Sequence, residues 1–126
     1  HPSFASISRE KMAEELETFE NYLRENVGYA SRYFRFPAGE HTESALELLQ
    51  SLGFVSVFWS TAYDDWDTNK VRGKDYAIEK VMSRIHDGSV ILLHAVSQDN
   101  ADALGEIIDR IRAEGYEFRA LTQYGT

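Results

Sequence analysis

The sequence predicts an α/β fold in which parallel strands are joined by crossover helices. Short apolar stretches alternate with amphipathic segments of helical period along the chain. The strand-like stretches are apolar almost without interruption, as in strands that are buried on both faces. No low-complexity linker and no internal repeat divides the 126 residues. We therefore expect one domain, residues 1–126, in which helices cover a parallel sheet.

The first predicted element is an amphipathic helix over residues 9–26. Its apolar residues recur at helical spacing, and charged residues fill the opposite face. Ser8 is placed to cap its N-terminus, and Gly28 is placed to end it. Its expected inward residues are Met12, Leu16, Phe19 and Leu23.

A short aromatic strand is predicted over residues 32–36, where Pro37 and Gly39 end it. Thr42 is the expected cap of a second helix, which stops at Gly53. The expected inward residues of this helix are Leu46, Leu49 and Leu52.

The centre of the chain contains a strand, an irregular segment and a third helix. Residues 54–59 are β-branched and aromatic, which favours a strand, whereas residues 60–73 lack periodicity. A helix over residues 74–86 follows. Its expected inward residues are Ala77, Val81 and Ile85.

The last predicted elements are a strand, a helix and a strand. Residues 89–94 form a buried strand after the turn signal at 86–88, and residues 97–100 begin a fourth helix. Gly115 stops that helix, and residues 116–124 supply the final strand. The helix presents Leu104, Ile107, Ile108 and Ile111 at core spacing.

Composition excludes several classes of protein. A net charge of −8 without a basic patch argues against a nucleic-acid partner. No apolar run reaches the roughly 18 residues of a membrane-spanning helix. The absence of cysteine excludes disulfides and thiolate chemistry, and it fits either an oxidising or a reducing compartment.

Polar residues follow three successive predicted strands. Arg35 lies at the end of the first strand, the segment YDDW at 63–66 follows the second, and His94 ends the third. Ligands and catalytic groups gather at the carboxyl ends of parallel strands. Any one of these residues alone is more simply explained as an ordinary loop residue. Their occurrence at the ends of three successive strands predicts a functional site. We expect Arg35, Asp65 and His94 to point into one cleft.

His94 completes an otherwise apolar strand, and the alternation of side chains places Leu92 on the same face. The histidine could do no more than bond a backbone carbonyl. It could instead act as a general acid or base, because imidazole titrates near neutral pH and a carboxylate can hold its tautomer. An acid from the 63–68 segment is the candidate partner.

Three motifs resemble those of a known family. RFPAG (35–39), DW (65–66) and ILLH (91–94), in this order, resemble the third to fifth motifs of NodB-type polysaccharide deacetylases, carbohydrate esterase family 4. The flanking stretches FWSTAYDDWDT, SVILLHAVSQDNADAL and EGYEFRAL look most like the branch that removes acetyl groups from muramic acid in peptidoglycan. The resemblance covers essentially the whole chain.

The resemblance implies an irregular (β/α) barrel with a divalent metal, zinc or similar, bound by one aspartate and two histidines. His1, which precedes a proline as in the family, is the implied second histidine ligand. The other ligands and the aspartate base would lie upstream, so we expect the chain to be the C-terminal two-thirds of the barrel and inactive alone. A terminal His-Pro pair could equally be a chain end or tag remnant; the family context favours the ligand.

Roles carry over to individual residues by resemblance. His94 would protonate the leaving amine, and Asp65 would orient it through the other ring nitrogen. Arg35 would position the aspartate base. Asp64 and Asp67 are expected to be solvated loop acids or contacts to the glycan.

The substrate pocket is also implied by resemblance. The backbone N–H of Ala38, just past Pro37, would donate to the oxyanion. Trp66 and Leu92 would wall the acetyl pocket, although Trp66 could equally be a core residue. Many relatives carry an aromatic residue or arginine at Ala38 and acids at Ala62 and Ala95, so this sequence departs from the family pattern there.

The resulting expectation is metal-dependent de-N-acetylation of peptidoglycan, outside the membrane of a bacterium. The alternative is a catalytically silent domain that binds glycan or acts as a scaffold. His94 and Asp65 favour the enzyme, because a binding domain would not need them. Self-association through an open barrel edge is a further expectation.

Overall fold

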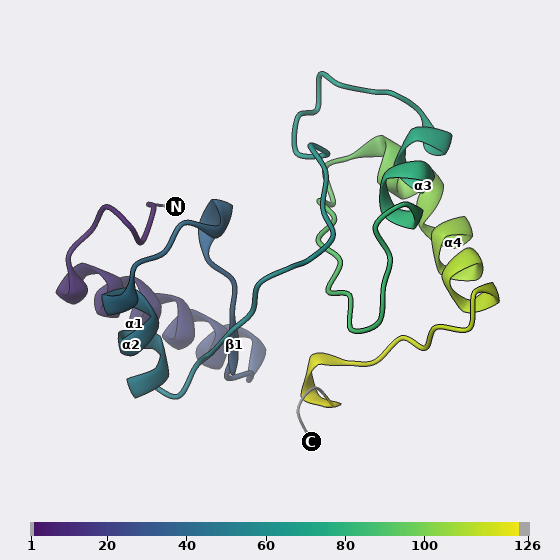
Figure 1. Ribbon diagram of the computed structural model, residues 1–126. Coiled ribbons are helices and arrows are strands. Elements are labelled where there is room, and N and C mark those ends of the chain that lie inside the picture. The colour runs from purple at the N-terminus through teal and green to yellow at the C-terminus, as the bar shows by residue number, and fades with distance from the viewer. Residues whose placement is uncertain (1, 124–126) are drawn as a thin grey trace. The chain divides into compact units, whose positions relative to one another are not determined.

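The computed structural model describes residues 2–123. The chain divides into two compact units, His1–Phe58 and Trp59–Thr126. Each contains helices and short extended segments (Figure 1). Each also has its own hydrophobic cluster. None of the helices in residues 2–123 combines the length and the apolar character needed to cross a bilayer.

The helices of the first unit begin at the predicted residues and end within two residues of the predicted ends. Helix α1 covers Arg9–Val27, helix α2 covers Glu43–Ser51, and a 3-10 turn, η1, covers Pro37–Gly39. The hydroxyls of Ser8 and Thr42 cap the two helices by accepting backbone N–H groups at 3.2 and 3.1 Å. Gly28 ends α1 in the left-handed conformation, with φ of 67°.

Two short strands of the first unit pair in parallel. Strand β1 is Tyr33–Phe34, strand β2 is Val55–Ser56, and α2 lies between them in the chain, as the prediction of crossover helices requires. The pairing places Tyr33 opposite Val55 and Phe34 opposite Ser56. Phe34 of β1 packs against an apolar cluster built mainly from aromatic and leucine side chains: Phe4, Met12, Leu16, Phe36, Ala45, Leu48 and Leu49.

The second unit is built on two helices that pack side by side (Figure 1). Helix α3 covers Lys74–Met82 and helix α4 covers Gln98–Ala113. The segments before and after α3 meet in a parallel bridge between Thr61 and Ile91, so this unit repeats the crossover arrangement. The buried core consists of Ala77, Ile78, Val81, Ala103, Ile107 and Ile111.

The predicted strands are much longer than the observed ones. The strands expected over 32–36 and 54–59 are reduced to β1 and β2, and the one expected over 89–94 contributes only the bridge at Ile91. In the described part of 116–124, residues 116–120 form no strand and Leu121–Gln123 is a 3-10 turn, η2. A strand requires a hydrogen-bonded partner as well as β-prone residues, and within each unit the described pairing extends over only these positions.

Several residues expected to face inward are exposed. Phe19 is 57% exposed, and Leu52 and Leu104 also face solvent, whereas Leu48 and Ala103 are buried. The helical period was correct, and Ala77 is buried as predicted, but the buried stripes of α2 and α4 are rotated toward small residues: Ala45 and Ala103 are fully buried. Small side chains let a helix approach its neighbour closely, which spacing alone does not reveal.

Candidate active site

Asp65 is a buried carboxylate in the irregular segment that follows the Thr61 bridge. Its side chain has no solvent exposure, although its neighbours Asp64 and Trp66 reach the surface. A carboxylate buried in this way must be paired with hydrogen-bond donors to remain ionised. The donors that Asp65 receives determine what it can do.

His94 supplies two of these donors. Its ring Nδ1 lies 2.8 Å from Asp65 Oδ1, and its backbone N–H donates to Asp65 Oδ2 at 2.7 Å. Because an ionised carboxylate can only accept, the proton on this side of the ring belongs to Nδ1. Nε2 is then left to face a reactant, and the imidazole is about one-third exposed. A buried carboxylate behind a partly exposed imidazole is the arrangement of a general acid or base.

Leu92 lies on the His94 side of its segment. Ile91 and Leu93 pack against the core of the second unit, and Leu92 is not among the residues of that cluster. Alternating side chains of an extended segment point to opposite faces, so Leu92 and His94 share the face away from this core. The backbone N–H of Leu92 donates to Thr61 O at 2.9 Å and holds the segment in place.

Asn100 and Tyr63 complete the surroundings of Asp65, and sequence reasoning missed both. Asn100 Nδ2 donates to Asp65 Oδ2 at 2.5 Å, and the Tyr63 hydroxyl donates to Asn100 Oδ1 at 2.5 Å. Burial raises the pKa of Tyr63. The sequence offered one indication of Asn100, which stands in the first turn of the predicted helix that follows His94.

Asp64 is paired rather than freely solvated. Arg72 holds its carboxylate from two nitrogens, at 2.8 and 3.1 Å, and Lys70 adds an ion pair at 3.3 Å. The Arg72 guanidinium, through these hydrogen bonds, lowers the pKa of Asp64 to about 2. Asp64 keeps 40% of its side chain exposed, as expected of a loop acid, and it is paired because Arg72, eight residues away, folds back onto the loop. Asp67 accepts from its near neighbour Asn69 and pairs with Lys70 at 3.5 Å.

Trp66 is not a core residue. Its side chain is 60% exposed, and Lys70 Nζ lies 6.0 Å from the centre of its ring. The alternative that this tryptophan belongs to the core is therefore wrong. An exposed indole remains available to a ligand.

Acid should weaken the fold through Asp64. Its folded pKa lies below the ordinary value of 3.8, so the stabilisation it provides is complete above pH 4 and is lost as the pH falls toward about 2. We expect Asp64→Asn to flatten the fall in the free energy of unfolding between pH 4 and pH 2, as measured by urea denaturation. Asp109→Asn, at an exposed aspartate with no ion pair among the described residues, is the control. Parallel curves for wild type and Asp64→Asn would contradict this role.

In the first unit, Pro37 and Ala38 form the tight turn that was expected to present an oxyanion donor. Ala38 adopts φ of 52°, which is unusual for a residue with a side chain. The two backbone hydrogen bonds of the turn are donated by Gly39 and Glu40, so neither uses the N–H of Ala38. Arg35 is exposed in the same stretch. The two units are described separately, so a cleft shared by Arg35, Asp65 and His94 stays a prediction.

Comparison with known proteins supports the motifs. A model of the polysaccharide deacetylase family matches residues 1–57. The chain is 39% identical to an uncharacterised 30.6 kDa protein of Geobacillus stearothermophilus and 34% identical to the peptidoglycan-N-acetylmuramic acid deacetylase PdaA of Bacillus subtilis. Each alignment covers 96% of this chain and 46% of the relative.

A solved structure agrees with these matches. That of Bacillus subtilis PdaA, a family 4 carbohydrate esterase, has a TM-score of 0.91 and 33% identity over 97% of this chain and 53% of that one. The chain belongs to the NodB-type polysaccharide deacetylases, carbohydrate esterase family 4. The α/β fold class predicted from sequence is thereby confirmed. The chain spans about half the length of the curated relatives it matches.

A deacetylase of this family is expected, by resemblance, to hold a divalent metal. The candidate ligand in this chain, His1, lies outside the described residues. Within residues 2–123, no group of three His, Cys, Asp or Glu side chains could hold a metal ion. The described residues therefore do not fit the metal on their own, and the chemistry they offer is that of the His94 and Asp65 pair.

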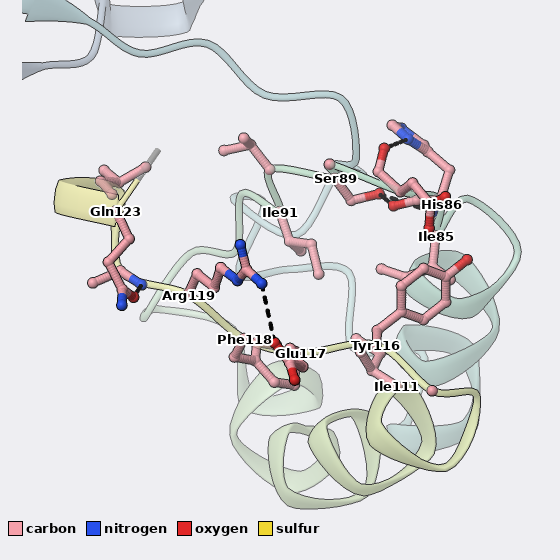
Figure 2. Close-up of a pocket in the computed structure, with 16 residues that line it drawn as sticks. Ile85, His86, Ser89, Ile91, Ile111, Tyr116, Glu117, Phe118, Arg119 and Gln123 are labelled. Carbon is pink, nitrogen blue, oxygen red and sulfur yellow. Dashed lines mark hydrogen bonds and ion pairs between the residues drawn. The ribbon is translucent and has the colours of Figure 1, made fainter. Parts of the chain in front are cut away.

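The second unit also contains a cavity of about 850 Å³ (Figure 2). It is lined by the turn at 86–89, by Ile91 and by the segment Tyr116–Ala120, where Arg119 pairs with Glu117 at 3.2 Å. Neither His94 nor Asp65 lines it. The cavity lies where the predicted final strand does not form, and it is separate from the candidate catalytic pair.

Proposed function

We propose that the protein is a peptidoglycan deacetylase that hydrolyses the N-acetyl group of amino sugars, with N-acetylmuramic acid as the preferred sugar. The observation that carries the proposal is the 2.8 Å contact between the partly exposed His94 imidazole and the buried Asp65 carboxylate. The sugar preference is supported by similarity to a relative named for N-acetylmuramic acid. Because peptidoglycan lies outside the membrane, the site of action is extracytoplasmic.

Hydrolysis of an amide requires a proton on the departing nitrogen. Water adds to the acetyl carbon, the C–N bond breaks, acetate forms, and the sugar amine leaves after it has been protonated. His94 gives that proton from Nε2, while Nδ1–H stays bonded to Asp65. Asp65 accepts the Nδ1 proton and so holds the ring with Nε2 free to carry the proton that is given.

The other residues have supporting roles in the proposal. The N–H of Ala38, presented by the turn after Pro37, donates to the oxyanion, and Arg35 positions the aspartate that acts as base. Leu92 and the exposed Trp66 contact the acetyl methyl group. Metal dependence is part of the proposal by resemblance, and His1 would be one ligand.

The test is release of acetate from glycan strands. The protein in its full length, supplied with zinc or another divalent ion, should release acetate from muramic-acid-containing peptidoglycan and much less after chelation. Residues 1–126 alone should release none. Glycan with acetyl groups only on glucosamine is the comparison substrate, and faster release from it would reverse the sugar preference. Binding of the glycan without any acetate release would favour the silent binding domain.

A further inference from the structure

We propose that Asn100 is a positioning residue that holds the Asp65 carboxylate, and through it the His94 ring, in the reactive arrangement. This inference rests on the proposed function, because it concerns the same acid. Asn100 is 6% exposed and lies in the first turn of α4, on a different element from both residues it would position. In the proposed reaction, Asn100 contacts neither the sugar nor the attacking water.

The amide of Asn100 bonds both members of the pair. Its Nδ2 donates to Asp65 Oδ2 at 2.5 Å and to the backbone carbonyl of His94 at 3.2 Å. One buried NH₂ group therefore links the carboxylate to the segment that carries the imidazole. Asp65 Oδ2 also accepts the backbone N–H of His94. These two donors, the Asn100 amide and the His94 backbone N–H, fix the orientation of the carboxylate so that Oδ1 faces the His94 ring.

The orientation of this amide is determined by its neighbours. Asn100 Oδ1 accepts the hydroxyl of Tyr63 at 2.5 Å, and burial raises the pKa of that phenol, so it keeps its proton at neutral pH. A flipped amide would place Oδ1 against Asp65 Oδ2 and the His94 carbonyl, which are both acceptors. The backbone of Asn100 is held as well, because its N–H donates to the capping hydroxyl of Ser97 at 3.2 Å.

This network places one proton at each link. Tyr63 donates to Asn100, Asn100 donates to Asp65, and His94 donates its Nδ1 proton to the other oxygen of Asp65. Both oxygens of Asp65 therefore act as acceptors in this network. The ring nitrogen that faces Oδ1 must then carry a proton, which favours Nδ1–H on His94. Bonds in such a buried network depend on one another, so loss of one link should disturb the ring.

The decisive variant is Asn100→Asp, which keeps the shape and replaces the NH₂ donor by an acceptor. Two carboxyl groups at this distance cannot both ionise, so they share a proton and Asp65 no longer holds its charge against the ring. In the protein in its full length, kcat for acetate release should fall roughly 10- to 100-fold, and KM should change by less than about threefold. Tyr63→Phe keeps the ring packing and should lower kcat by a smaller factor, about two- to tenfold.

A second readout does not depend on activity. With ¹⁵N-labelled histidine, the wild-type protein should show a slowly exchanging Nδ1–H resonance for His94, assigned by its absence in His94→Gln, and Asn100→Asp should lose it. Asn69→Asp is the matched control, since Asn69 also donates to an aspartate, Asp67 at 3.3 Å, but on the exposed loop. It should keep the resonance and the wild-type kcat.

The outcomes separate the two proposals. If the wild type releases no acetate, the proposed function fails, and the resonance alone then decides the role of Asn100. Wild-type kcat together with an intact resonance in Asn100→Asp would overturn the positioning role. If that variant does not fold, Tyr63→Phe decides, and wild-type values in both readouts would overturn it as well.

Discussion

His94→Ala is expected to abolish acetate release by the protein in its full length while the fold remains. The imidazole is the proposed source of the proton for the leaving amine, and general acid catalysis contributes roughly 10²–10⁴ to a rate. His94 is about one-third exposed and lies outside the core of its unit, so truncation opens no large internal cavity. Water can reach the Oδ1 of Asp65 that loses its donor.

The fold and the activity of this variant must be measured together. Acetate release reports the chemistry, and thermal unfolding by circular dichroism reports the fold. His86→Ala is the matched control, because His86 is an exposed histidine in a turn, and within residues 2–123 its ring bonds only the adjacent Asp87 carbonyl, at 2.9 Å. Activity that survives His94→Ala in a folded protein would rule out His94 as the acid.

Asp65→Asn should be nearly as damaging, for a different reason. Asp65 accepts three N–H groups, two from His94 and one from Asn100. If the oxygen of an asparagine at position 65 accepts the backbone N–H of His94 and the amide of Asn100, its NH₂ group must face the His94 ring. The ring must then turn Nδ1 into an acceptor and carry its proton on Nε2, and the imidazolium loses its counter-charge.

We expect a fall in kcat of about 10²–10⁴ and a loss of stability of about 1–3 kcal/mol from the mismatched buried group. The change of tautomer should appear in the ¹⁵N shifts of His94. Asp102→Asn serves as the control, since Asp102 accepts one side-chain donor, Gln98, on the exposed face of α4. A variant that keeps both the wild-type rate and the wild-type tautomer would remove Asp65 from the mechanism.

The helices show what local sequence can determine. The capping hydroxyls of Ser8 and Thr42 and the left-handed Gly28 act on backbone groups a few residues away, and all three were predicted. Strand lengths were not predictable in the same way, since a ladder requires a partner that lies far along the chain. The buried faces were predicted in part: Met12, Val81 and Ile107 are buried as expected. The burial of Ala45 and Ala103 in place of Leu52 and Leu104 was instead set by what their helices pack against.

The candidate site shows the same division between what the sequence predicts and what only the fold decides. His94 and Asp65 could be named in advance because motif order and strand-end position identify them. Their pairing was expected, but its geometry, and the links that Asn100 and Arg72 make from other elements, became visible only in the fold. Residue types and spacing specify which chemistry the chain can perform. Which donor meets which acceptor is decided by tertiary packing, because a hydrogen bond depends on distances of a few tenths of an ångström that spacing does not encode.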